Sequence, residues 1–276
     1  MRRTGPLLLV APLVAFMLVF YAVPLLSMLS RGFYGPGLTL EHYARLTGDD
    51  VFAHVIWITA RTAIVVTLFT LVLGYPVALA LSRLNRSAAA VVLVLILLPF
   101  WTSVLVRSYA WMVVLGRRGL LNELLLSSGL IDAPLKLLNT PLAVHVAMIH
   151  ILLPYMILPI AASLRGIDAA LPRAAAGLGA RPLTVFARVI LPLSVPGVAA
   201  GVLLVFVQAL GFYITPALVG GPRDLMLSML IAQQVDLLNW SYAACLSTAL
   251  LVLTLLTILA FQRLPGVRDV LQAAAR

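Results

Sequence analysis

Long apolar runs recur along the chain, and each is about the length that a helix needs to cross a bilayer. A membrane-spanning helix needs about 20 mostly apolar residues, because the hydrocarbon core is about 30 Å thick and offers no partner for backbone polar groups. We expect six spans, at 7–29, 62–82, 88–115, 141–163, 197–219 and 241–262. The sequence therefore predicts an all-α integral membrane protein, with residues 1–276 forming a single transmembrane domain.

Composition agrees with this fold class and excludes several functions. Hydrophobic residues make up 63% of the chain and charged residues only 10%. The core of a soluble protein does not need so large a share of apolar residues. The net charge of +10 is scattered between the apolar runs, so it does not indicate a nucleic-acid surface. The one cysteine, Cys245, lies in an apolar run and has no second cysteine to pair with.

The distribution of charge predicts how the spans are oriented. Met1-Arg2-Arg3 precedes an apolar run that is too long for a signal peptide, so we expect an uncleaved first span whose N-terminus lies inside. The inner segments of the six-span layout then hold eleven arginines and two acids, whereas the outer segments hold six basic residues and seven acids. Basic residues collect on the cytoplasmic side of membrane proteins, so both termini are predicted to be cytoplasmic.

Motifs of catalysis do not occur in the sequence. It has no Gly-rich Walker loop for ATP, no HExxH or Cys/His spacing for zinc, and no Gly-x-Ser-x-Gly nucleophile turn. His145 and His150 are five residues apart, which places them on different faces of a helix. We therefore expect no enzymatic activity, no catalytic residue and no metal site in this chain.

The segment 164–196 is a long polar break between the fourth and fifth spans. Its arginines outnumber its single acid, Asp168, so it should be cytoplasmic. Pro172 and the alanines at 174–176 predict a short helix that Gly177 and Gly179 end. A second short helix is predicted to stop at Pro192. The product would be a helix-turn-helix elbow outside the bilayer, suited to docking against a partner.

This elbow resembles the EAA loop of the membrane subunits, or permeases, of bacterial ABC importers. The pattern of that loop is Glu-Ala-Ala, three residues, Gly, nine residues, Ile, one residue, and Leu-Pro. The chain keeps these spacings, with Val189 in place of Ile and Arg173 in place of Glu, which reverses a charge. The resemblance assigns coupling to an ATPase to Arg173, Ala174, Ala175, Gly179, Ala180, Val189, Leu191 and Pro192.

Other motifs resemble the spermidine/putrescine branch of these permeases and cover most of residues 98–240. They are Leu98-Pro99-Phe100-Trp101-Thr102-Ser103, Arg107, Tyr109-Ala110-Trp111, Gly119-Leu120-Leu121-Asn122, Leu153-Pro154-Tyr155, Leu158-Pro159, Thr215-Pro216-Ala217-Leu218-Val219-Gly220-Gly221-Pro222 and Ile231-Ala232-Gln233-Gln234. The resemblance implies the type I ABC importer permease fold with a cytoplasmic coupling helix, in the bacterial inner membrane. It also implies import of a small cationic solute, most simply a polyamine.

The resemblance further implies partners. They are a second permease that is related but different, two ATPase subunits that bind ATP and Mg, an extracytoplasmic solute-binding protein and the lipid membrane, with no nucleic acid and no cofactor on this chain. Two alternatives stay open: a permease of this type for another small organic solute, such as an amino acid derivative or phosphonate, and a membrane scaffold that transports nothing.

Intramembrane charge and aromatic residues suggest a translocation path. Arg107 lies inside a predicted span, where a charge is a functional candidate or a paired structural group. Aromatic side chains can meet an amine by cation–π contact, or can belong to an interfacial belt, the interpretation we prefer for Trp111 and Trp240. Outer acids can attract a cation or be solvated loop residues. The candidate path comprises Trp101, Arg107, Tyr109, Phe212, Tyr213, Asp224 and Asp236.

Overall fold

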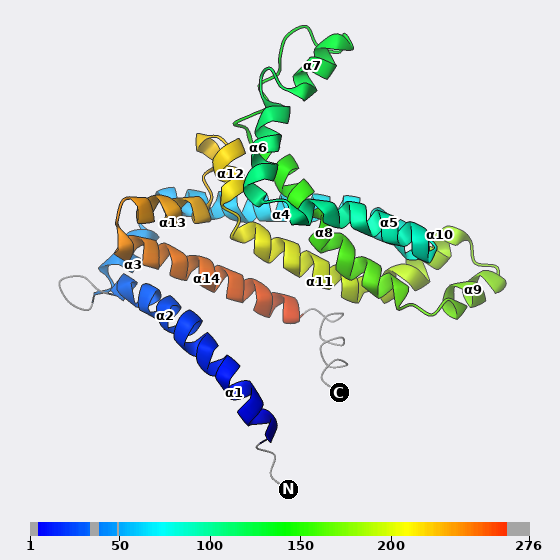
Figure 1. Ribbon diagram of the computed structural model, residues 1–276, viewed down its shortest axis with the longest axis horizontal. Coiled ribbons are helices and arrows are strands. Elements are labelled where there is room, and N and C mark those ends of the chain that lie inside the picture. The colour runs from blue at the N-terminus through cyan, green and yellow to red at the C-terminus, as the bar shows by residue number, and fades with distance from the viewer. Residues whose placement is uncertain (1–4, 34–38, 49, 264–276) are drawn as a thin grey trace.

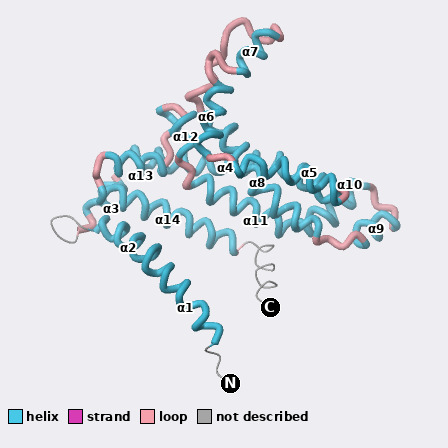
Figure 2. The backbone as a smooth tube through the Cα atoms, in the orientation of Figure 1, coloured by secondary structure: helices cyan, strands magenta, loops and turns pink. Residues whose placement is uncertain are grey.

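A bundle of long helices forms the body of the protein. The computed structural model describes residues 5–33, 39–48 and 50–263, and the regular elements in these ranges are all helices. Helices α4 (Asp50–Arg83), α8 (Pro141–Arg165) and α11 (Leu191–Leu210) pack against one another, and α14 (Trp240–Gln262) packs along α11 (Figure 1). Figure 2 shows that loops connect the helices and that the body of the protein is helical.

The centre of the bundle is the buried face of α8. Met148, Leu152, Met156 and Ile160 are spaced by four residues, which places them on one side of the helix, and all four are fully buried. Two glycines of α11 let its backbone approach α8. A Cβ at Gly197 would lie 2.6 Å from the Pro159 carbonyl oxygen, and one at Gly201 would lie 3.1 Å from that of Met156. The two glycines therefore serve packing within the chain.

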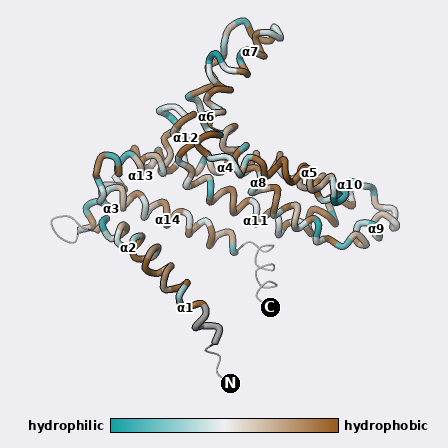
Figure 3. The backbone as a smooth tube through the Cα atoms, viewed as in Figure 1, coloured by the Kyte–Doolittle hydropathy of each residue, from teal (hydrophilic) through white to brown (hydrophobic). Residues whose placement is uncertain are grey.

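The N-terminal helix diverges from the bundle. Helix α1 (Gly5–Met17) continues through a π-helical segment (Leu18–Ala22) into α2 (Val23–Ser30). Large apolar side chains on successive faces are exposed, among them Phe16, Phe20 and Leu26. Figures 1 and 3 show α1 as an apolar helix that projects away from the other spans. An apolar helix with no buried face needs lipid or another protein around it.

The stretch expected as the third span, 88–115, is broken. Helix α5 (Arg86–Leu97) ends in a 3₁₀ turn (Leu98–Trp101) and is followed by α6 (Val104–Leu115); the segments Arg86–Trp101 and Val104–Ser127 meet at a bend of 96°. Pro99 lies in the first turn of the 3₁₀ segment, and proline cannot continue the hydrogen bonding of the preceding helix. By length and hydropathy, five described helices can cross a membrane, or six if the bent pair counts as one span.

Two expectations are wrong: the helix stop at Pro192 and the uninterrupted helix 197–219. Pro192 does not stop the second elbow helix, because α10 (Pro182–Val185) continues through a π-helical segment (Phe186–Ile190) into α11. Pro192 is the second residue of α11 and directly follows the π-helical segment, so the helix runs through it. The predicted helix 197–219 is also not continuous, because α11 ends at Leu210 and α12 (Ile214–Val219) begins after a turn.

Several segments expected as outer loops contain helices. They are α3 (Glu41–Thr47), the first three turns of α4, α7 (Leu120–Ser127), a 3₁₀ turn (Pro222–Asp224) and α13 (Leu227–Asp236). Of these, α7 begins directly after Gly119, within the Gly-Leu-Leu-Asn motif. The terminal charges that entered the topology prediction, Arg2, Arg3, Arg268, Asp269 and Arg276, lie outside the described residues.

Candidate functional site

The elbow begins with α9 (Ala170–Gly177), whose start is fixed by local hydrogen bonds. The Asp168 carboxylate accepts the N–H of Ala170 at 2.8 Å and thereby satisfies one of the free donors of the first turn. Arg173, which stands where the EAA pattern has glutamate, donates from Nε to the Ala169 carbonyl at 3.0 Å. This bond lies one turn back on the same helix, so Arg173 supports α9 itself.

Gly179 ends this helix in a left-handed conformation. Its φ is +85°, and its N–H donates to the Ala176 carbonyl at 2.9 Å. The next N–H, of Ala180, donates to the Ala175 carbonyl at 3.1 Å, which completes a Schellman motif. Glycine adopts this φ without steric cost. The glycine of the EAA pattern therefore coincides with a backbone requirement.

Three leucines along the elbow are exposed. Leu178, between the two glycines, is 90% exposed, and Leu183 is 77% exposed. Leu171, at the start of α9, is 49% exposed. We refer to Leu171, Leu178 and Leu183 as the elbow leucines. The sequence analysis did not single them out, although an isolated leucine between two glycines in a basic loop was a usable signal for a docking residue.

Helix α4 holds both ends of the elbow. At the first end, Arg165 Nη2 donates to the Leu81 carbonyl at 3.2 Å. At the second end, the Tyr75 hydroxyl lies 2.9 Å from Ser194 Oγ, and its ring meets Phe186 edge-on at 5.9 Å between centroids. A displacement of the elbow must therefore move α4, or break these contacts.

The second half of the predicted coupling segment joins the bundle. Val189 is half-buried in the π-helical segment, whereas Leu191 and Pro192 are exposed at the start of α11. These three residues follow α10, whereas Leu171 and Leu178 precede it and Leu183 lies within it. The structure thus divides the EAA spacing into a protruding part, 173–180, and a part that belongs to a long helix, 189–192.

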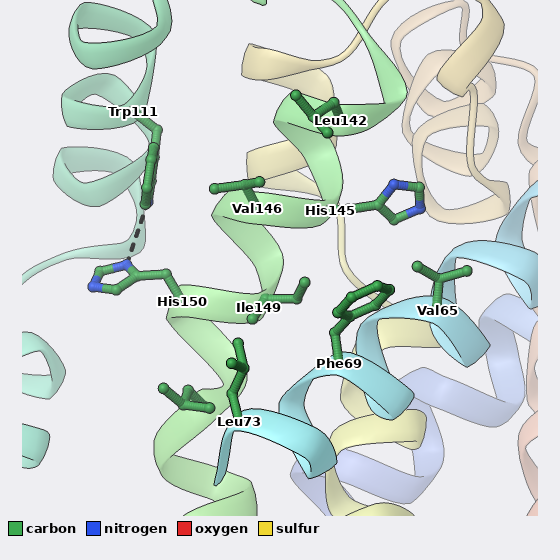
Figure 4. A pocket seen from close by; sticks show the side chains of 10 residues that line it. Val65, Phe69, Leu73, Trp111, Leu142, His145, Val146, Ile149 and His150 are labelled. Atoms are coloured by element: carbon green, nitrogen blue, oxygen red, sulfur yellow. Dashed lines mark hydrogen bonds between the residues drawn. The ribbon is translucent and has the colours of Figure 1, made fainter. Parts of the chain in front are cut away.

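The break in the third span brings several sequence motifs together. Phe100 of the 3₁₀ turn packs on Tyr155 of α8, with ring centroids 4.9 Å apart. Further along, Trp111 Nε1 donates to His150 Nδ1 at 3.3 Å, as Figure 4 shows. The motifs that contain Pro99 and Pro154 therefore meet at one junction between α5, α6 and α8.

Helix α6 is also joined to α12. The hydroxyls of Ser108 and Thr215, both fully buried, lie 2.8 Å apart. Because Ser108 donates its own hydrogen to the Val104 carbonyl, Thr215 is the donor in this pair. Helix α6, which carries Tyr109, therefore packs against α12, which begins directly after Tyr213. Neither hydroxyl was predicted as a site residue.

The predicted path residues fall into two groups. Trp101, 89% exposed, and Arg107, whose buried Nε has no hydrogen-bond partner in the described part of the chain, lie beside the broken span. Tyr109, Phe212 and Tyr213 lie along α6 and before α12, near the same junction. Asp224 and Asp236 are elsewhere. Asp224 is nearly buried and accepts the Gly221 N–H at 2.8 Å, and Asp236 is exposed at the end of α13.

Asp224 therefore stabilises the loop before α13, and it lines a groove that contains none of the other candidate path residues. This groove has a volume of about 410 Å³, and its lining includes Arg61, His145 and Arg223. Two arginines accompany the one carboxylate, so the groove does not favour a free cation. The expectation that Asp224 attracts a cationic solute is not supported by this environment.

Another groove, of about 530 Å³, is apolar and lies between α4, α6 and α8. Trp111 and His150 form one wall, and His145 points to the other side of α8, as predicted from their spacing (Figure 4). None of its lining residues is acidic. Among the described residues, no group of three or more His, Cys, Asp or Glu side chains is placed to hold a metal ion.

The loop after α6 is fixed by one buried amide. Asn122 of α7 accepts the Leu135 N–H at 2.8 Å and donates to the carbonyls of Gly116 and Leu135 at 3.1 and 3.0 Å. The Gly-Leu-Leu-Asn motif thus ties both ends of the loop together. These hydrogen bonds hold α7 to the rest of the loop where it projects from the bundle (Figure 1).

Comparison with known proteins agrees with this geometry. The permease PotB of the spermidine/putrescine transport system of Haemophilus influenzae is 36% identical over 247 residues, which is 89% of this chain and 86% of PotB. PotB of Escherichia coli K12 is 34% identical over 264 residues, 92% of this chain and 96% of PotB.

The fold also matches a solved transporter. A chain of a bacterial alginate ABC transporter, crystallised with an alginate pentasaccharide-bound periplasmic protein, has a TM-score of 0.80. Each chain is covered to 95%, with 18% sequence identity. Residues 70–264 match the model of the family described as the binding-protein-dependent transport system inner membrane component. The chain belongs to this family of inner-membrane permeases of ABC transport systems.

Proposed function

We propose that this chain is the permease subunit of an ATP-driven importer that carries a polyamine such as spermidine or putrescine. The observation that carries the proposal is its 36% identity with a spermidine/putrescine permease over 89% of the chain. The motifs behind this resemblance meet around the break in the third span, where Phe100 packs on Tyr155. Specificity for the solute is shared with the binding protein that delivers it.

The elbow is the proposed contact with the ATPase. The stretch from α9 to α10 presents the elbow leucines to the cytoplasm, where they fit an apolar groove on an ATPase subunit. Two ATPase subunits, one below each permease, bind ATP and Mg, and this chain binds neither. Because α4 holds both ends of the elbow, closure of the ATPases turns α4 together with α8 and α11. Rocking of these helices alternates access to the path.

The exposed apolar surface supports a second permease. Helix α1 and the exposed faces of α5 and α6 carry large apolar side chains that the chain itself does not cover. A related but different permease, together with lipid, covers these surfaces in the proposed complex. The solute-binding protein docks on the opposite side from the elbow, over α7 and α13. Both termini are cytoplasmic in this arrangement, in agreement with the charge distribution.

The junction of α6 with α8 and α12 is the proposed section of the path. Aromatic residues there, including Trp101, Tyr109 and Tyr213, are exposed and available for cation–π contact with an amine. Arg107 beside them opposes a free cation. We propose that it limits leakage when the second permease closes the path.

Uptake by the reconstituted complex tests this function. The chain is purified with its copurifying subunits, placed in vesicles with internal ATP, and given labelled spermidine with the binding protein outside. We expect uptake that requires both ATP and the binding protein and that unlabelled putrescine reduces. Uptake of an amino acid derivative or phosphonate, with no effect of polyamines, would show that the proposed substrate is wrong. Absence of uptake for every solute would favour the scaffold alternative.

Leu178→Asp separates the docking role from the solute. A charge at this position opposes burial in an apolar groove, so we expect loss of the ATPase from the purified complex and loss of uptake. Leu130→Asp is the matched control, because Leu130 is 73% exposed in the outer loop. Equal recovery of the ATPase with both variants would contradict the proposed docking residues.

A further inference from the structure

A basic groove lies at the end of the bundle where the elbow begins. It has a volume of about 430 Å³ and is lined by Leu84, Arg86, Ala89, Ala90, Leu93 and Arg165. The turn between α4 and α5 supplies Arg86, and the last residue of α8 is Arg165. Two separate elements thus bring two positive charges to one groove at the end of the spans.

The arginines of this groove have free hydrogen-bonding capacity. Arg165 uses Nη2 for the Leu81 carbonyl, and a guanidinium has five N–H donors, so the group is oriented and still has donors to offer. Arg86 is exposed and makes no ion pair with any described residue. Arg86 is also the first residue of α5, a helix of 12 residues, whose N-terminal end attracts negative charge.

The rest of the groove is apolar. Ala89, Ala90 and Leu93 lie one turn further along α5, so the wall runs from the charged end towards the interior of the span. A ligand that matches both parts has a negative head and an alkyl body. Free phosphate would match only the arginines, whereas a zwitterionic lipid would bring a positive group close to them.

We propose that this groove binds an anionic phospholipid of the cytoplasmic leaflet, with the phosphate between Arg86 and Arg165 and an acyl chain along Ala89, Ala90 and Leu93. Basic pockets between membrane helices on the cytoplasmic side suit such head groups. The bound lipid bridges α5 and α8 beside the first residue of the elbow. The proposal depends on the membrane position of the chain and not on which solute is carried.

Native mass spectrometry of the full chain, with any copurifying subunits, tests the site. The protein is offered phosphatidylglycerol and phosphatidylcholine with identical acyl chains, and the retained lipids are counted. We expect wild type to retain phosphatidylglycerol in preference. Arg86→Gln and Arg165→Gln should each lower that preference roughly fivefold, the value for one basic side chain near a charged surface. Arg165→Lys, which keeps the charge, should preserve most of it.

Arg83→Gln is the matched control. Arg83 lies in the same turn, is exposed and does not line the groove. Its substitution removes the same charge at the same membrane level, so it should leave the lipid preference unchanged. An equal effect of Arg83→Gln would show general surface attraction and overturn the site, as would equal retention of both lipids by wild type or full retention in both groove variants.

Glycerol phosphate distinguishes a lipid from a free phosphate compound. Short-chain phosphatidylglycerol should raise the melting temperature of the detergent-purified protein, whereas glycerol phosphate at the same concentration should not. An equal rise with both compounds would assign the groove to a soluble phosphate and overturn the lipid proposal. Arg86→Gln breaks no hydrogen bond of the described structure, so this comparison does not rest on a variant with a damaged fold.

Discussion

The Tyr75 hydroxyl donates to Ser194 Oγ at 2.9 Å, because the Ser194 hydrogen is already given to the Leu191 carbonyl. This bond joins the middle of α4 to the start of α11, directly after the elbow. The edge-on contact of Tyr75 with Phe186 lies beside it. One side chain thus couples the π-helical segment and α11 to the central helix of the bundle.

Tyr75→Phe should weaken coupling and leave docking intact. The substitution keeps the ring contact and removes the hydrogen bond, which in membrane proteins contributes about 0.6 kcal/mol and at most about 1.7 kcal/mol. We expect unchanged recovery of the ATPase and a severalfold lower uptake per ATP hydrolysed, measured in vesicles. Tyr43→Phe is the control, because its bond to Thr248 lies far from the elbow. The same loss of uptake in both variants would argue against a specific role for Tyr75.

Gly179→Ala should distort the end of the elbow helix. No atom lies within 4 Å of the Cβ that alanine would add, so the effect comes from φ +85° alone. A non-glycine residue in this region is disfavoured by roughly 1–2 kcal/mol. We expect weaker binding of the ATPase in a pull-down.

Gly177→Ala is the matched control for this change. Gly177 is the last residue of α9, has helical geometry and also has open space around its Cα. Alanine there should be neutral or favour the helix by roughly 0.5–1 kcal/mol. A stronger effect at Gly177 than at Gly179 would contradict the role assigned to the left-handed turn.

Gly201→Leu should separate α11 from α8. Its Cβ would already lie 3.1 Å from the Met156 carbonyl oxygen, and backbone atoms cannot yield as a flexible side chain can. Overpacking of this kind costs roughly 1–3 kcal/mol or more. We expect a lower melting temperature in detergent. Gly211→Ala, where no atom lies within 4 Å of the new Cβ, should melt as wild type does.

Ser108→Ala should leave the Thr215 hydroxyl buried without its acceptor. An unmet buried donor costs about 1–3 kcal/mol, whereas removal of both hydroxyls can be nearly neutral. We therefore expect Ser108→Ala to lower the melting temperature more than the double substitution Ser108→Ala with Thr215→Val. A double variant that is as unstable as the sum of its single variants would show that the two hydroxyls do not interact.

Local chemistry was sufficient for much of the fold. The apolar runs gave the long helices, because a bilayer leaves only helices or closed barrels for the backbone. Gly179 marked the end of the elbow helix, since its effect is on its own backbone. The resemblance to the EAA loop depended on such local features, and the family assignment is confirmed.

Tertiary packing decided what single residues do. Pro192 reads as a helix stop in the sequence, but the π-helical turn before it shifts the bonding pattern so that the helix continues. In the sequence, Asp224 can be a solute-attracting acid or a solvated loop charge, whereas in the folded loop it accepts the Gly221 N–H and lines a groove with two arginines.

Residues that are 79 to 119 positions apart in the chain meet in the fold. Hydrogen bonds join Tyr75 to Ser194 and Ser108 to Thr215, and Arg86 and Arg165 line one groove. The sequence by itself determined the helices, their proline and glycine punctuation and the elbow, because each depends on neighbouring residues or on the bilayer. Which side chains meet was decided only by the packing of α4, α8 and α11, because contacts between distant residues depend on how whole helices fit together.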